Sequence, residues 1–98
     1  MAQLRFLHLG VNFTNASANF DRQADIEAIL NQAKDWFRYA PNCWLIYTVQ
    51  TPAVWHNRLK EGVSWITQET YLIAPIDLTQ KSGWLRKSAW EWINQTRS

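Results

Sequence analysis

Few side chains in this sequence have the type and spacing that catalysis or metal binding requires. Cys43 is the only cysteine, so it cannot form an intramolecular disulfide, and a lone thiol in an apolar strand usually packs as a small hydrophobe. His8 has no other metal-binding side chain near it at the spacing of a metal site. Glycine-rich phosphate loops and the CxxC, HExxH and GxSxG motifs are absent. The sequence therefore predicts no catalytic residue, no metal site and no cofactor.

Basic and aromatic side chains offer a second kind of chemistry, which is contact with a nucleic acid. Arginine and lysine would contact phosphates, and Trp36 or Trp44 would stack on bases. Ten basic residues against eight acidic ones give a net charge of +2, which is too small to indicate nucleic-acid binding by itself. Binding without cleavage therefore remains an alternative, with ordinary solvated charges as the competing interpretation. The basic residues concerned are Arg5, Arg38, Lys81, Arg86 and Lys87.

The composition predicts one domain, residues 1–98, with a single hydrophobic core. An apolar content of 47% is too high for general disorder. No apolar run reaches the roughly 18 residues of a transmembrane helix. Arg5 and His8 interrupt the short apolar run at the N-terminus, so we expect no signal peptide and a cytoplasmic protein. The seven tryptophans are expected to pack in the core and at its rim, with a stacking or partner surface as the alternative.

A β-hairpin near the middle of the chain organises the rest. The strand-like runs Trp36–Ala40 and Cys43–Val49 flank Pro41-Asn42, a dipeptide that favours a turn because proline fixes φ and asparagine tolerates the left-handed region. Both faces of Cys43–Val49 are apolar, which predicts a central strand. Arg38 indicates that the preceding strand lies at an edge of the sheet.

Before the hairpin, the pattern predicts a strand and then a helix. Leu4–Phe13 alternates, and both of its faces carry apolar residues, which is typical of a central strand. Apolar residues then recur with a helical period up to Ala33, and Asp21 is the expected N-cap. The helix should end near Lys34, where the strand-favouring aromatic residues begin.

After the hairpin, the pattern predicts a helix, a strand and a further helix. Thr51-Pro52 is a typical helix start, and Gly62 is placed to end that helix. Thr70–Leu78 is the last strand, and Pro75 assigns it to an edge of the sheet because proline lacks the N–H that a ladder needs. A tryptophan-bearing helix is expected over Lys81–Gln95.

This order predicts an α+β fold, a ferredoxin-like βαββαβ sandwich with an additional C-terminal helix. The strand order 4-1-3-2 places the two apolar strands in the centre and the strands with Arg38 and Pro75 at the edges. Two helices cover one face of such a sheet, so the second face also needs cover. The C-terminal helix or a second subunit would supply it, and we expect a homodimer. Either Trp44 and Ile46 or Leu45 and Tyr47 point to that second face.

The hairpin and the segments around it resemble a known family. Trp36-Phe37, a turn and the strand Trp44–Thr48 resemble the hairpin of small bacterial proteins of the SinR family, which are similar to CRISPR-associated ferredoxin-like nucleases and VapD-type ribonucleases. The sequences TYLIAPIDL and GWLRKSAWEWI resemble the last strand and the tryptophan-bearing tail of that family. The resemblance spans about residues 4–95.

The same resemblance bears on activity through Asn12. The nucleases place an aspartate at the end of the first strand, where two such carboxylates in a symmetric dimer hold a divalent cation. Asn12 occupies that position here, and an amide is a poorer ligand for a hard cation and no general base. Neither Asp21, the expected helix cap, nor Asp77, on a distant edge strand, replaces the missing carboxylate.

The sequence therefore favours a non-catalytic, dimeric interaction or regulatory module. The alternatives are a metal-dependent nuclease related to the CRISPR-associated endoribonucleases and a nucleic-acid-binding protein without cleavage activity. The expected partners are a second copy of the chain and another protein. The candidate interaction surface consists of Asn12, Trp36, Arg38 and Trp44.

Overall fold

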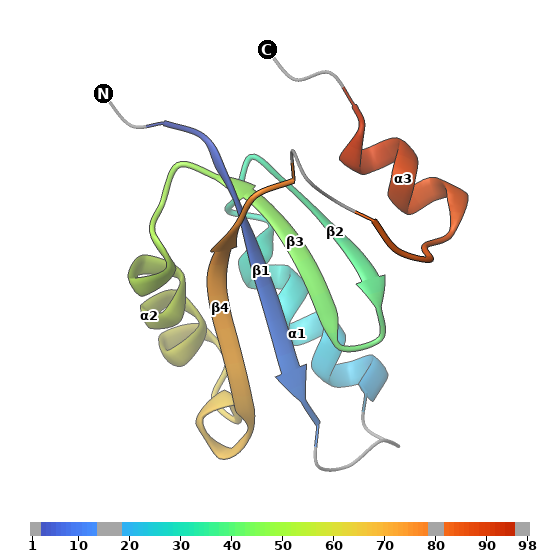
Figure 1. Cartoon of the computed structure of the whole chain (residues 1–98). Helices are drawn as coiled ribbons and strands as arrows, with labels where there is room; N and C mark the ends of the chain where they lie inside the picture. Colours follow the sequence, from blue (N-terminus) through green and yellow to red (C-terminus); the bar gives the residue numbers. More distant parts are fainter. Residues whose placement is uncertain (1–2, 14–18, 79–81, 96–98) are drawn as a thin grey trace.

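The protein folds as one antiparallel sheet with helices on both sides (Figure 1). The computed structural model describes residues 3–13, 19–78 and 82–95. None of the helices in these ranges is long and apolar enough to span a membrane. In chain order the elements are β1 (Arg5–Asn12), α1 (Asn19–Leu30), β2 (Asp35–Ala40), β3 (Cys43–Thr48), α2 (Pro52–Gly62), the 3-10 helix η2 (Ile66–Gln68), β4 (Thr70–Ile76) and α3 (Lys87–Ile93).

The four strands lie in the order β2-β3-β1-β4, and all neighbours are antiparallel. The predicted central positions of β1 and β3 and the edge positions of β2 and β4 are confirmed. The hairpin is confirmed as well, with Arg38 opposite Trp44 and Ala40 opposite Cys43. An irregularity in the register between Arg38 and Ala40 leaves Tyr39 as an extra residue next to the turn.

The hydrophobic core lies between the sheet and the layer formed by α1 and α2. Leu9 lies opposite Trp44 in the register of β1 and β3, and alternate residues of both strands point into this layer. Of the two orientations that the sequence left open for β3, the structure therefore has Trp44 and Ile46 in the core and Leu45 and Tyr47 on the second face. The core residues are Leu7, Leu9, Val11, Ile26, Leu30, Trp44, Ile46, Trp55, Leu59, Val63 and Ile66.

The start of α2 follows the predicted mechanism, but its end does not. Thr51 Oγ1 accepts from the Val54 N–H at 3.4 Å, and Pro52 is the first helical residue. Gly62 is the last residue of α2 and has no left-handed conformation. A Cβ on Gly62 would lie 2.3 Å from Ile29 Cδ1, so this glycine is needed for the close approach of α1 and α2 and not for a cap.

Two other helix boundaries also differ from the prediction. Helix α1 begins at Asn19 and ends at Leu30, so Asp21 lies within its first turn and is not its N-cap. Helix α3 is shorter than predicted and begins at Lys87. Gly83 has a φ of 158°, which no helix accommodates, and Arg86 is still extended. The predicted start of the helix at Lys81 lies outside the described residues.

Candidate functional site

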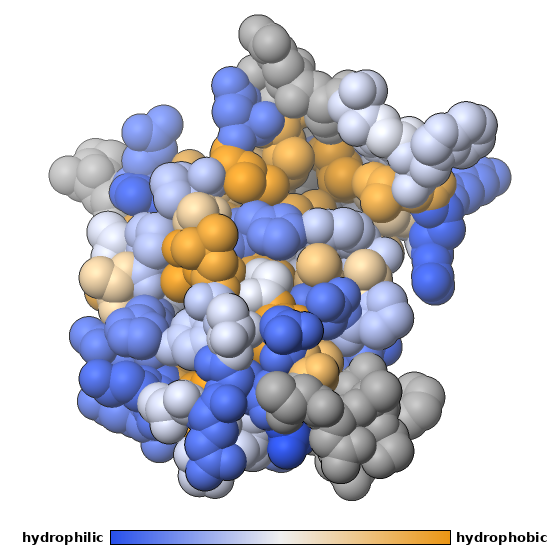
Figure 2. Space-filling model, turned by 60° about the horizontal axis from the view of Figure 1, so that its bottom comes forward, coloured by the Kyte–Doolittle hydropathy of each residue, from blue (hydrophilic) through white to orange (hydrophobic). Residues whose placement is uncertain are grey.

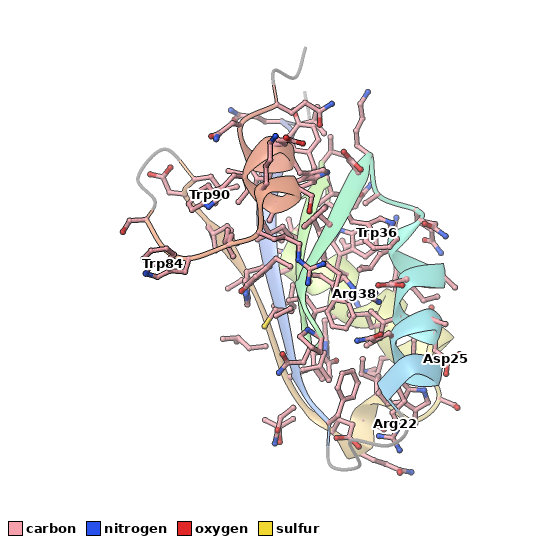
Figure 3. All side chains as sticks on the ribbon, turned by 90° about the vertical axis from the view of Figure 1, so that its right-hand side faces the viewer. Arg22, Asp25, Trp36, Arg38, Trp84 and Trp90 are labelled. Atoms are coloured by element: carbon pink, nitrogen blue, oxygen red, sulfur yellow. The ribbon has the colours of Figure 1, made fainter. Side chains whose placement is uncertain are left out.

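The candidate site is the face of the sheet that α1 and α2 leave uncovered, called the second face below. Figure 3 shows Trp84 and Trp90 on this side of the sheet, whereas Trp36 and Arg38 lie on the side of α1. The central strands β1 and β3 contribute mainly apolar side chains to this face. The edge strands β2 and β4 extend the face on either side. On this face β1 and β3 carry Phe6, His8, Gly10, Cys43, Leu45 and Tyr47.

Helix α3 covers one end of the second face. Trp92 stacks on Phe37 with the ring centroids 5.8 Å apart, and it meets Phe6 edge-on at 5.9 Å. Trp92 Nε1 also donates to Asp35 Oδ2 at 2.9 Å. Aromatic pairs of this geometry and a hydrogen bond to a carboxylate both favour a docked helix. Helix α3 of the same chain therefore covers part of this face. The sequence had allowed either this helix or a second subunit as the cover.

The other end of the second face exposes a large apolar side chain. Leu72 of β4 lies opposite Gly10 of β1, and 70% of Leu72 is exposed. A shallow hollow of about 280 Å³ runs past these two residues to Asn12, Asn42 and Thr70. None of the described residues that line the hollow is charged. This surface therefore combines a large exposed leucine with uncharged polar side chains.

A histidine and a tyrosine lie between these two ends. His8 Nε2 and the Tyr39 hydroxyl form a hydrogen bond across 31 residues of sequence. Burial lowers the pKa of His8 below its ordinary value of 6.5. Burial, followed by a hydrogen bond with Cys43 and the charge of the Cys43 thiolate, raises the pKa of Tyr39 to about 12. Both side chains are therefore neutral at pH 7 and offer hydrogen bonds without charge.

The lowered pKa of His8 predicts a specific dependence of stability on pH. As the pH falls through 6.5, the unfolded chain gains a proton that folded His8 resists, so the free energy of unfolding should decrease. The decrease should stop once the pH is below the pKa of folded His8. Urea unfolding between pH 8 and pH 5.5 measures it. The His8→Gln variant should lose this part of the pH dependence, and the exposed His56→Gln control should keep it; equal slopes in all three proteins would contradict the assignment.

Trp44 does not lie on a surface. It is 0% exposed, and its Nε1 donates to Glu27 Oε2 at 2.9 Å. The side chain lies on the core face of β3, between the sheet and α1, because its strand position alternates with the second-face residue Leu45. The prediction that Trp44 belongs to an interaction surface, or stacks on bases, is therefore corrected: Trp44 is a core residue.

Trp36 and Arg38 lie together on the core side of edge strand β2, beside α1. Trp36 Nε1 donates to Asn31 Oδ1 at 2.9 Å. Arg38 Nη1 donates to Glu27 Oε2 at 2.7 Å and to Gln23 Oε1 at 3.0 Å. A phosphate would have to replace this carboxylate partner, so the contact disfavours Arg38 as a phosphate-binding residue.

Asn12 is separated from the other three candidate residues. It is exposed at the end of β1 and alternates onto the second face, next to Thr70 of β4. The structure therefore brings Trp36 and Arg38 together, but it divides the four predicted residues between two faces of the sheet. Among the described residues, no group of three or more histidine, cysteine, aspartate or glutamate side chains could hold a metal ion.

The other basic residues considered for nucleic-acid binding do not form one surface with Trp36 and Arg38. Arg5, Arg86 and Lys87 are exposed, and Lys87 pairs with Glu91 of its own helix at 3.8 Å. Arg5 begins β1, whereas the other two lie at the start of α3. Lys81 lies outside the described residues.

The sequence does not reveal the pairing of His8 with Tyr39. The one available signal was the alternation of β1, which placed His8 on the face opposite Leu7 and Leu9. The position of Tyr39 depends on the irregularity next to the hairpin turn, which strand periodicity alone does not predict.

Comparison of the chain with protein-family models, with curated proteins and with solved structures finds no match, so its second face has to be interpreted from its own geometry.

Proposed function

We propose that the chain is a ferredoxin-like domain with an added C-terminal helix, and that it acts as a non-catalytic interaction module in the form of a homodimer. Counted from β4, the strands follow the order 4-1-3-2, with α1 and α2 on one face, and this arrangement supports the fold assignment. The observation that carries the functional proposal is the exposed Leu72 beside the hollow on the second face, whose described lining residues carry no charge.

A second copy of the chain is the partner that this surface suits best. In a twofold interface only the residues near the axis meet their own symmetry mates, so a charged residue there is repelled by its copy. The hollow around Leu72 and Gly10 has no charged residue among those described, so two copies meet there without such repulsion. A standard interface takes about 800 Å² from each partner. That is roughly an eighth of the 6362 Å² surface of this chain.

The mass in solution tests this proposal. Light scattering is expected to give twice the chain mass of 11.6 kDa, at low and at moderate salt alike, because an uncharged apolar contact is not screened by ions. Leu72→Lys should shift the equilibrium to the monomer, since it places two like charges near the twofold axis.

Val54→Lys is the matched control. Val54 is also an exposed large hydrophobic residue, at 37%, but it lies on α2, on the other side of the sheet. This variant should remain dimeric. A wild-type chain that stays monomeric at millimolar concentration, or a control that dissociates as readily as Leu72→Lys, would refute dimerisation through this surface.

A further inference from the structure

A cavity of about 340 Å³ lies between α3 and the second face of the sheet. Its floor runs across the sheet from Tyr39 of β2 over Leu45 of β3 and His8 of β1 to Ile76 of β4, and His8 and Tyr39 are hydrogen-bonded to each other. Figure 2 shows hydrophobic side chains, in orange, mainly in the upper and middle parts of the view, whereas the lower part is mostly hydrophilic. The described lining of the cavity is mainly apolar and aromatic, with the His8–Tyr39 pair in the floor and Ser82 at the side as its polar positions.

The roof of the cavity is rich in aromatic surface. Trp90 and Ile93 of α3 close it from above, and Trp84 stands at its side in the extended segment before the helix. Trp84 is 101% exposed, which is unusual for a side chain that adjoins an apolar cavity. A large aromatic residue gains about 25 cal/mol for each Å² of apolar area removed from water. A ligand in the cavity would supply that burial for Trp84.

The size and charge of the cavity define the class of ligand. An apolar cavity of about 150 Å³ is known to hold benzene. The present volume is about twice that, which suits two fused aromatic rings. None of the described residues that line the cavity is an aspartate, glutamate, lysine or arginine, so a charged ligand would find no counter-charge among them.

We propose that this cavity is a binding site for an uncharged two-ring aromatic molecule whose single hydroxyl or carbonyl group hydrogen-bonds to the His8–Tyr39 pair. The pair can both donate and accept, depending on the tautomer of His8, so either oxygen group finds a partner. The cavity and the hollow around Leu72 have no lining residue in common. Ligand binding and dimerisation are therefore separate proposals, and either one can fail without the other.

The test uses 2-naphthol as the probe and the intact, ¹⁵N-labelled chain. Titration followed by NMR should shift the indole N–H signals of Trp84 and Trp90, with saturation by about 1 mM probe, as ligand efficiencies for a molecule of this size imply. The signals of Trp44 and Trp55 should stay in place, because both residues lie in the core on the other face of the sheet. No saturation, or equal shifts of all four signals, would overturn the site.

Matched probes test the chemistry. Tyr39→Phe removes the hydroxyl and should weaken 2-naphthol about five-fold, the effect of one ordinary hydrogen bond, with no change for naphthalene. Equal effects on both probes would overturn the role of the polar pair. The charged 2-naphthalenesulfonate should bind at least ten-fold more weakly than 2-naphthol. Equal affinity would overturn the uncharged class.

Filling the cavity tests its position. Leu45→Phe in the floor and Ile93→Phe in the roof should each abolish saturation by either probe, so the two variants check each other if one of them unfolds. Val54→Phe is the control, because it adds the same ring at an exposed position on α2, outside the cavity and away from the proposed dimer surface. Retained binding in both folded filling variants, or loss of binding in the control, would place the probe elsewhere.

Discussion

Trp44→Ala is expected to lower the free energy of unfolding by about 3–5 kcal/mol, the usual cost of removing a large buried aromatic side chain. Trp44 is 0% exposed and is among the largest fully buried side chains of the chain. Its removal leaves a cavity next to Leu9 and takes the indole N–H away from Glu27. A domain of this size has a total stability of roughly 5–15 kcal/mol, so the variant should lie close to its unfolding threshold.

Urea unfolding followed by far-ultraviolet circular dichroism measures this change without depending on tryptophan fluorescence. Trp84→Ala is the matched control, since it makes the same substitution at a fully exposed side chain and should change stability by no more than about 0.5 kcal/mol. Trp44→Phe keeps most of the ring volume and removes the Glu27 hydrogen bond, so it should fall between the two. A loss of less than about 1 kcal/mol in Trp44→Ala would mean that the core does not depend on this residue.

The sheet could be predicted from the sequence because its causes are local. Both faces of β1 and β3 are apolar, whereas Arg38 and Pro75 mark β2 and β4 as strands that can do without a second neighbour. The dipeptide Pro41-Asn42, which favours a turn, likewise predicted the hairpin of β2 and β3. These patterns lie within single strands or between adjacent ones, so short-range reasoning was sufficient.

The fate of each tryptophan could not be predicted, because burial depends on distant elements. Trp44 is in the core because α1 packs on that side of β3 and brings Glu27 to its indole N–H. Trp36 lies nearer the edge and is hydrogen-bonded to Asn31, and Trp84 is fully exposed. Periodicity predicted which residues share a face with Trp44, but not which face the helices would occupy.

The candidate site was predictable only in outline. The need for cover on the second face followed from the number of helices, and α3 supplies part of that cover. The cavity depends on where α3 begins, and that is set by Gly83 and the extended Arg86 and not by the helical pattern of the tail. The His8–Tyr39 pair joins β1 to an irregular position in β2, which no pattern within either strand reveals.

Trp92→Ala is expected to release α3 from the sheet while the core stays folded. A helix of seven residues is too short to be stable alone, so α3 depends on its docking contacts. Two aromatic pairs contribute about 0.5–1.5 kcal/mol each, and the hydrogen bond to the Asp35 carboxylate contributes about 1.5–3 kcal/mol. Because Trp92 is only half-buried, we expect a total loss of about 2–3 kcal/mol.

Amide hydrogen exchange separates this local release from global unfolding. In Trp92→Ala the amides of Trp90 and Asn94 should lose their protection, whereas those in β1 and β3 should keep most of theirs. Trp92→Phe keeps a ring over Phe37 without the indole N–H, so its α3 amides should show intermediate protection. Since α3 forms the roof of the cavity, naphthol binding should disappear with α3 protection in the alanine variant. Undiminished protection of the α3 amides in Trp92→Ala would show that other contacts hold the helix, and it would remove Trp92 as the residue that closes this end of the second face.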